Sequence, residues 1–273
     1  MTTLWVNGRL CDPDEPSICA LDHGFTVGDG VFETLKVVDG VPFALTRHLE
    51  RLERSATGLG LRPPDRDRIR AGCQEVLTAQ PNDGVLRLRI TYSAGRGPLG
   101  SDRTDTEPTL VVAASPASAW APGTAVVIAP WPRNERGALV GLKTTSYADN
   151  VMALAWAHER GASEAILLNT RGELCEGTGS NVFVVIEGQV LTPPLSSGCL
   201  AGITRQLVLE WTAAQEADLD AIALRQASEA FLTSSTRDVQ PIIAVDGIEL
   251  PAGPVTGMVQ RVFTERSEAD LDP

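Results

Sequence analysis

Strand-like and helix-like patterns alternate along this chain in two blocks, separated by a segment of small residues and prolines at 115–123. In the first block, Asn7-Gly8 and Asp39-Gly40 are typical of tight β-hairpin turns, so this block should begin as antiparallel sheet. Apolar side chains at every second position of 84–93 predict a half-buried strand. Thr46 and Asp65 are expected to cap two helices that cover the sheet.

The second block predicts a larger lobe of mixed helices and strands. The patterns favour strands at 124–128, 165–168, 181–186, 189–192 and 230–233, and helices at 148–160, 204–214 and 254–265. We therefore expect an α/β (α+β) protein with a small N-terminal lobe at 1–114, an interdomain linker at 115–123 and a larger C-terminal lobe at 124–273. The acidic end, 265–273, is expected to fray.

Charge and composition exclude several classes of protein. The net charge of -12 argues against a nucleic-acid or anionic membrane surface, because such partners require clustered positive charge. No apolar run approaches the roughly 20 residues that span a bilayer, and no secretory signal is evident, so a cytoplasmic protein is expected. The 5 cysteines are scattered, without Cys-x-x-Cys pairs, which favours reduced thiols and no metal site.

Lysine is scarce in this chain. Only Lys36 and Lys143 occur among 23 basic residues, the other 21 being arginines. An amine can lose its proton when it is desolvated and can then attack a carbonyl, whereas a guanidinium stays protonated. Lys143 is the better candidate for such chemistry, because it lies in a stretch of small residues, while Lys36 lies within a predicted strand. Two ordinary surface lysines in an arginine-biased protein remain the alternative.

The second block also carries the polar motifs. Glu176 follows a predicted hairpin turn and precedes small residues, so it could pair with a ring nitrogen or simply belong to a turn. Gly202-Ile203-Thr204 leads into a helix and fits either a phosphate site or an ordinary N-cap. Ser235-Thr236 follows a buried strand and presents hydroxyls. Arg51 lies on a predicted helix in the first block and could reach an anion.

Taken in order, these motifs resemble one known family over residues 4–263. The runs that carry the resemblance are DHGFTVGDGVFET at 22–34, HLERL at 48–52, Lys143 with Tyr147, EGTGSNVF at 176–183, TPPL at 192–195, GCLAGITR at 198–205 and FLTSST at 231–236. They are similar to the class IV aminotransferases, the fold type IV pyridoxal phosphate enzymes. That family includes D-amino acid, branched-chain and (R)-amine transaminases and aminodeoxychorismate lyase. The resemblance implies two α/β lobes with pyridoxal 5'-phosphate (PLP) between them, in a homodimer whose partner lends residues to each site.

The resemblance also implies roles for individual residues. Lys143 would hold PLP as an imine and move the substrate proton, and Glu176 would keep the pyridine nitrogen protonated. Leu200 would pack on the ring, and Tyr147 would reach its 3'-oxygen. The groups expected to bind the phosphate are Arg51, Gly202, Ile203, Thr204, Ser235 and Thr236.

Substrate specificity is less fully determined by the motifs. Phe32, with Thr34 beside it, stands where D-amino acid transaminases often carry a carboxylate-binding tyrosine, and Arg96 is expected to grip the substrate carboxylate. We expect a transaminase that acts on D-amino acids, with tolerance for (R)-amines because the Phe32 side is apolar. Aminodeoxychorismate lyase is the alternative reaction. A non-catalytic binding protein for phosphorylated metabolites is the alternative class.

Overall fold

A computed structural model describes residues 1–81 and 84–273, which form two compact units. Unit 1 comprises Met1–Ser118, Leu142–Tyr147 and Leu271–Pro273, and unit 2 comprises Ala119–Gly141 and Ala148–Asp270. The chain first leaves unit 1 inside the expected linker, 115–123. The predicted lobe boundaries placed Leu142–Tyr147 and Leu271–Pro273 with the C-terminal lobe, whereas the structure packs both segments with the N-terminal unit.

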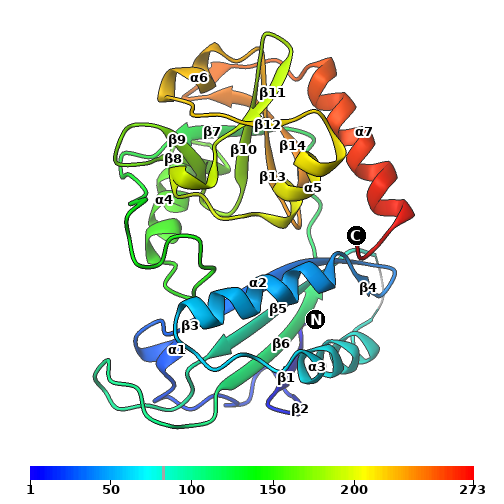
Figure 1. Cartoon of the computed structure of the whole chain (residues 1–273). Coiled ribbons are helices and arrows are strands. Elements are labelled where there is room, and N and C mark those ends of the chain that lie inside the picture. Colours follow the sequence, from blue (N-terminus) through cyan, green and yellow to red (C-terminus); the bar gives the residue numbers. More distant parts are fainter. Residues whose placement is uncertain (82–83) are drawn as a thin grey trace. The chain divides into compact units, whose positions relative to one another are not determined.

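Unit 1 is built on a six-stranded sheet with the order β2-β1-β6-β5-β3-β4 (Figure 1). Its strands are β1 (Thr3–Val6), β2 (Arg9–Cys11), β3 (Gly30–Val38), β4 (Val41–Pro42), β5 (Leu86–Ser93) and β6 (Thr109–Pro116). All neighbouring pairs are antiparallel. Both predicted hairpins are present, with Asn7-Gly8 and Asp39-Gly40 at positive φ between paired strands.

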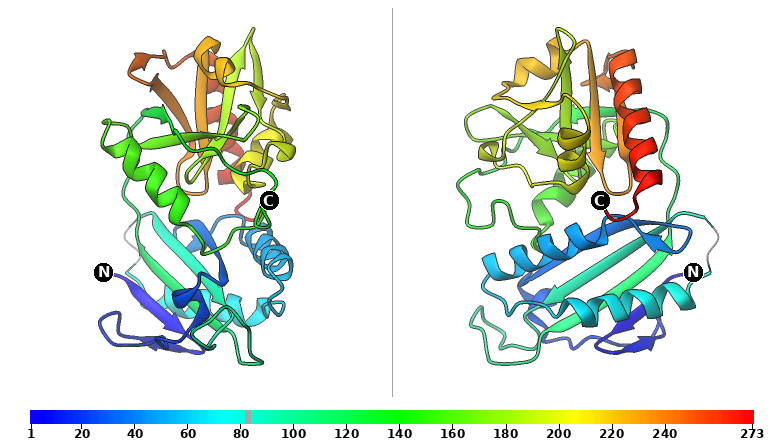
Figure 2. Two further views of the ribbon diagram at one scale, coloured as in Figure 1. Left: turned by 90° about the vertical axis from the view of Figure 1, so that its left-hand side faces the viewer. Right: turned by 45° about the vertical axis from the view of Figure 1, so that its right-hand side comes forward.

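Helices α2 (Leu45–Gly58) and α3 (Arg66–Ala79) cover one face of this sheet, while the short α1 (His23–Thr26) precedes β3 (Figure 2). The apolar core between helices and sheet contains alternate residues of each strand, such as Leu35 and Leu88, packed with Leu49 and Ile69 from the helices. Burial of these side chains is the main stabilising contribution.

The predicted caps of the two helices have different outcomes. Asp65 caps α3 and accepts hydrogen bonds from the amides of residues 67 and 68, as predicted. Thr46 does not cap α2: Ala44 occupies that position, and the Thr46 amide donates instead to the Asp272 carboxylate at 2.8 Å. The predicted frayed end is therefore wrong, since Asp272 is bound to the start of α2.

Unit 2 contains a nine-stranded sheet with the order β12-β11-β10-β13-β14-β7-β8-β9, and β15 pairs with β14. Its strands are β7 (Thr124–Ile128), β8 (Glu164–Leu168), β9 (Leu174–Gly177), β10 (Asn181–Ile186), β11 (Gln189–Thr192), β12 (Gln215–Glu216), β13 (Glu229–Ser234), β14 (Asp238–Val245) and β15 (Ile248–Glu249). Strand β7 lies between β14 and β8 and is parallel to both.

Four α-helices and one 3-10 turn accompany that sheet in the described part of unit 2. They are α4 (Ala148–His158), η1 (Leu195–Ser197), α5 (Ile203–Trp211), α6 (Ala221–Gln226) and α7 (Pro254–Ala269). Helix α7 packs along β13 and β14, and α4 packs on β8 (Figure 2). The largest cluster of buried apolar side chains in this unit includes Val184, Leu224, Leu232 and Ile242.

Across the described residues, no helix combines the length and the apolar character needed to cross a membrane. The 5 cysteines of the chain are all free thiols. The same residues contain no group of three His, Cys, Asp or Glu side chains arranged to hold a metal ion.

Candidate active site

The segment that carries Lys143 lies against the start of β3 in unit 1. The Phe32 amide donates to the Lys143 carbonyl at 3.0 Å, and the Thr145 amide donates to the Gly30 carbonyl at 2.8 Å. Between these bonds, Val31 and Thr144 form an isolated β-bridge. On its other side, the Lys143 amide donates to the Oγ atom of buried Ser55 on α2 at 3.1 Å. Hydrogen bonds from a strand and a helix therefore fix the backbone of this lysine.

Aromatic rings surround the amine of Lys143. Its Nζ atom lies 4.4 Å from the centre of the Phe32 ring and 5.9 Å from that of Tyr147. The two rings meet edge to face with centroids 5.3 Å apart. The Arg89 guanidinium stacks on the Phe32 ring at 3.8 Å, and Arg89 pairs across the sheet with Thr34. Phe32, Thr34, Lys143 and Tyr147, all named from the sequence, thus lie in one region of unit 1.

A buried ionic cluster lies on the opposite face of β3 from Phe32. Glu33 accepts hydrogen bonds from Arg51 at 2.7 Å (Nε to Oε1) and 2.6 Å (Nη2 to Oε2). Its Oε2 atom also lies 2.6 Å from Nδ1 of His48. Burial alone would raise the pKa of Glu33, but the Arg51 and His48 interactions outweigh it and lower that pKa to about 2. Arg51 is therefore held by an ionised carboxylate that the sequence did not identify.

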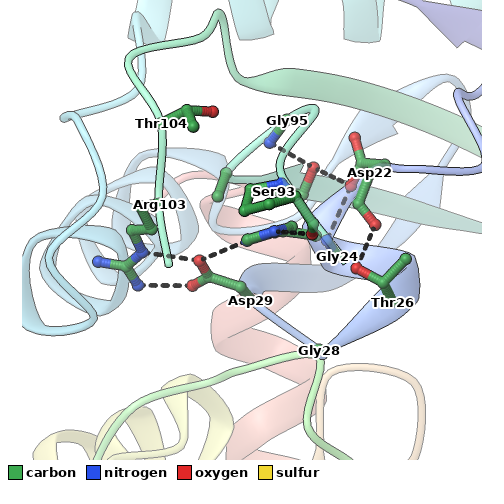
Figure 3. Close-up of polar contacts among 12 residues, drawn as sticks. Asp22, Gly24, Thr26, Gly28, Asp29, Ser93, Gly95, Arg103 and Thr104 are labelled. Atoms are coloured by element: carbon green, nitrogen blue, oxygen red, sulfur yellow. Dashed lines mark hydrogen bonds and ion pairs between the residues drawn. The ribbon is translucent and has the colours of Figure 1, made fainter. Parts of the chain in front are cut away.

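Arg96 lies on a loop of unit 1 beside α1. Its side chain is exposed, and its carbonyl accepts a hydrogen bond from Thr106 at 2.7 Å. Figure 3 shows the neighbouring polar contacts: Asp22 accepts from the Gly24 amide and from Ser93, and Arg103 forms two hydrogen bonds with Asp29. This loop lines a cavity of about 110 Å³ together with the residues at 60–62 and 103–106.

In unit 2, Glu176 lies at the end of β9 with its carboxylate largely buried. Its Oε2 atom accepts a hydrogen bond from the Leu200 amide at 2.9 Å, and its Oε1 atom lies 3.2 Å from Nε of Arg133. The two contacts fix both oxygens. The sequence analysis assigned both Leu200 and Glu176 to the cofactor site, and the structure places the Leu200 backbone next to the Glu176 carboxylate.

The start of α5 exposes backbone amides rather than a capping side chain. Gly202 is the N-cap residue and no side chain caps the helix there, so Ile203 and Thr204 form its first turn. A Cβ atom on Gly202 would lie 1.9 Å from the Asn181 Oδ1 atom, which leaves room only for glycine. Such a helix start suits an anion, because its amides and dipole are both positive.

Ser235 and Thr236 lie in the turn that joins β13 to β14. Buried Glu164 holds the next residue, since its Oε2 atom lies 3.3 Å from Nη2 of Arg237. Glu164 also accepts hydrogen bonds from the Thr178 amide at 3.0 Å and from Ser180 Oγ at 3.0 Å. One buried carboxylate therefore connects the hydroxyl-bearing turn with the loop that follows Glu176.

The residues named from the sequence fall into two groups, one in each unit. Unit 1 supplies an amine among aromatic rings and a clamped guanidinium; unit 2 supplies a buried carboxylate, an uncapped helix start and a hydroxyl-bearing turn. In unit 1 the amine suits a carbonyl carbon and the guanidinium suits an anion; in unit 2 the carboxylate suits a basic ring nitrogen, and the helix start and the turn suit a phosphate.

Sequence reasoning missed Glu33, Arg89 and Arg133. The sequence pattern could have revealed Glu33, because this charged residue lies between Val31 and Leu35 on the buried face of β3, where an apolar residue is expected.

Comparison with known proteins gives consistent results. The family model described as "Amino-transferase class IV" matches residues 30–245. A putative branched-chain-amino-acid aminotransferase of Methanocaldococcus jannaschii is 31% identical, with 89% of this chain and 88% of that protein covered. A D-alanine aminotransferase of Listeria innocua is 28% identical, and the match covers 95% of this chain and 94% of that protein. A bifunctional aminodeoxychorismate lyase / D-amino acid transaminase of Mycobacterium tuberculosis is 31% identical, covering 97% of each.

Solved structures agree with these relatives. The branched-chain aminotransferase from Thermoproteus uzoniensis with norvaline has a TM-score of 0.90 at 30% identity, with 96% of this chain and 93% of that one covered. A PLP-bound hypothetical aminotransferase from Mycobacterium tuberculosis has a TM-score of 0.87 at 28% identity, and the match covers 96% of this chain and 97% of that one. The match extends over nearly the full length of each protein.

Proposed function

Because this chain belongs to the class IV aminotransferase family and is a PLP-dependent enzyme of fold type IV, we propose that it moves the amino group of a D-amino acid, such as D-alanine, to an α-keto acid. The observation that carries the proposal is the position of Lys143. Its amine lies among the rings of Phe32 and Tyr147, whereas Lys36, the other lysine of the chain, lies 5.5 Å from the ring of Phe43.

Lys143 attaches the cofactor and transfers the proton. Bound PLP supplies an electron-poor ring that takes up the electron pair left when the substrate loses its Cα proton. The Lys143 amine would accept that proton and would later return it to the C4' carbon of the cofactor. Glu176 holds a positive charge at the ring nitrogen, because a buried carboxylate favours the protonated form. Leu200, whose amide fixes Glu176, packs on the ring.

By resemblance to the family, the groups that would hold the phosphate are Arg51, the first turn of α5 and the hydroxyls of Ser235 and Thr236. Two features support this assignment. No side chain caps the first turn of α5, which begins after Gly202. The Thr233 hydroxyl, at the end of the strand that leads to Ser235, is buried without a hydrogen-bond partner among the described residues. Tyr147 would reach the cofactor's 3'-oxygen.

Phe32, Thr34 and Arg96 bind the substrate. The Phe32 ring provides an apolar wall that also admits (R)-amines, and the guanidinium of Arg96 pairs with the substrate carboxylate. The names of the relatives support a D-amino acid donor, since several are D-alanine aminotransferases over most of this chain's length.

The enzyme works as a cytoplasmic homodimer. Phe25 and Leu99 are 78% and 83% exposed, and large apolar side chains at the surface of unit 1 suit contact with a second copy. Sedimentation at several concentrations tests the dimer.

Aminodeoxychorismate lyase is a second candidate reaction. The bifunctional relative of Mycobacterium tuberculosis, which carries both activities in its name, favours it. Both reactions use the same cofactor and the same lysine.

Paired assays decide between the two reactions. D-alanine with 2-oxoglutarate should yield pyruvate and glutamate, while aminodeoxychorismate alone should yield little pyruvate. Pyruvate from the second assay without turnover in the first would establish the lyase. L-leucine with 2-oxoglutarate is included because the Methanocaldococcus jannaschii relative is named as a branched-chain enzyme. A colourless protein that stays colourless with PLP would instead favour a binding protein.

A further inference from the structure

Glu33 is a charged residue in an apolar position. Strand β3 alternates, so Val31, Glu33 and Leu35 share the face that packs against α2, and all three are fully buried. The flanking residues of that face join the hydrophobic core. A carboxylate at such a position is costly unless its hydrogen bonds and its charge are both compensated.

Two residues of α2 compensate the charge and the hydrogen-bonding needs of the Glu33 carboxylate. Arg51 donates from Nε and Nη2 to the two carboxylate oxygens at 2.7 and 2.6 Å. His48 lies one turn earlier, with Nδ1 2.6 Å from Oε2. Because an ionised carboxylate only accepts hydrogen bonds, Nδ1 carries a hydrogen, and burial lowers the pKa of His48 so that its ring is neutral. The cluster therefore combines one anion, one cation and one neutral imidazole.

This arrangement fixes the orientation of the Arg51 guanidinium. A guanidinium is planar, and two bonds along its Nε–Nη2 edge determine both its plane and its rotation. The remaining edge, which carries Nη1, then points away from Glu33. His48 donates a third hydrogen bond, which in turn restricts the carboxylate. Rotation of Arg51 would break two charge-assisted bonds between buried groups.

We infer that Glu33 is a positioning residue for the cofactor phosphate, which it aligns through Arg51. The inference rests on the proposed function, in which Arg51 binds that phosphate. Glu33 touches neither the cofactor nor the substrate. Its contribution is to direct the Nη1 edge of Arg51 before PLP arrives, which reduces the ordering that binding would otherwise require.

The test separates geometry from charge. Glu33→Asp keeps the negative charge but withdraws the carboxylate by one methylene, so it cannot hold both bonds. We expect the full-length protein stripped of cofactor to bind PLP about 10-fold more weakly in this variant. Binding of pyridoxal, which has no phosphate, should change by less than about 2-fold, because that ligand does not need Arg51. Equal losses for both ligands, or unchanged or tighter PLP binding, would overturn the inference.

A double-mutant cycle with Arg51→Gln provides the second measurement. If Glu33 acts through Arg51, the Glu33→Asp effect on PLP affinity disappears once Arg51 is replaced; additive effects would overturn the inference. Glu53→Asp is the matched control. Glu53 lies on α2, the helix that carries Arg51, and its carboxylate accepts a hydrogen bond from Arg66 at 2.8 Å at the protein surface. Circular dichroism confirms that each variant is folded. The absence of a borohydride-stable PLP adduct at Lys143 in the wild-type protein would contradict the proposed function itself, and the affinity ratios above do not measure that adduct.

Discussion

The Nζ atom of Lys143 lies 4.4 Å from the centre of the Phe32 ring, directly over an aromatic face. An ammonium group in that position is stabilised by the ring, while the apolar wall limits its access to water. The neighbouring residue, Glu33, points to the other face of the strand and binds Arg51. Strand β3 therefore contributes to two parts of the site through side chains of opposite parity.

Replacing Lys143 by alanine should abolish turnover and leave the protein folded. A methyl group can neither attach the cofactor nor transfer the proton, so kcat should fall by about 10³-fold or more. Transamination assays and circular dichroism measure the two effects. Lys36→Ala is the control, and loss of activity in that variant but not in Lys143→Ala would show that the wrong lysine has been assigned.

Glu176→Gln should lower kcat by about 10²-fold to 10³-fold, with a smaller effect on PLP retention. The charge at the ring nitrogen matters most in the transition state, whereas the phosphate contacts remain. Steady-state kinetics and dialysis of the PLP-bound protein measure the two effects. Glu173→Gln, on a nearby carboxylate that bonds Asn169 at 2.7 Å, is the matched control. Equal rates for wild type and Glu176→Gln would exclude contact with the ring.

Glu33 should make the stability of the protein depend on pH. Its pKa falls from 4.5 to about 2 in the folded protein, so its stabilisation is present above about pH 4.5 and is lost as the pH falls toward 2. The difference in unfolding free energy between wild type and Glu33→Gln should therefore narrow by about 1 kcal/mol between pH 6 and pH 3.5.

Urea unfolding at both pH values measures that difference. Burial lowers the pKa of His48 in the folded protein, and the Glu33 carboxylate opposes that shift. If the unfolding free energies of wild type and Glu33→Gln differed by the same amount at both pH values, the lowered pKa of Glu33 would be contradicted.

Arg96→Ala should raise KM for D-alanine about 10-fold and leave kcat within a small factor, because a charge-assisted pair with the carboxylate is lost. Arg62→Ala is the control: Arg62 lines the same cavity but is paired with Glu107. An unchanged KM in Arg96→Ala would remove its proposed role, and a rise with both substitutions would indicate a general effect of positive charge.

Local patterns predicted the elements whose determinants are local. The bounds of β10 and β11 match their predictions, because the turn between them and the apolar run of β10 are contained in a dozen residues. Asp65 caps α3 through its own neighbours. Thr46 failed as a cap because Asp272, far away in sequence, binds its amide. No local pattern contains that information.

The site shows the same division. Motif resemblance selected Lys143, Arg51 and Glu176 as candidates, but the groups that contact them depend on pairings that are distant in sequence. Ser55 reaches the Lys143 amide from a helix 88 residues earlier. The attachment of 142–147 to unit 1 depends on bonds to β3, and the sequence around Lys143 gives no sign of them.

The two units are not continuous in the chain, and this affects how the protein must be made. During synthesis, all six strands of the unit 1 sheet have been translated by residue 116, yet the segment with Lys143 follows only after part of unit 2. Leu271–Pro273, which belong to unit 1, follow all of unit 2. A nascent chain that ends between residues 116 and 142 therefore carries the whole six-stranded sheet without Lys143, so the proposed attachment of PLP must wait until that segment has been translated.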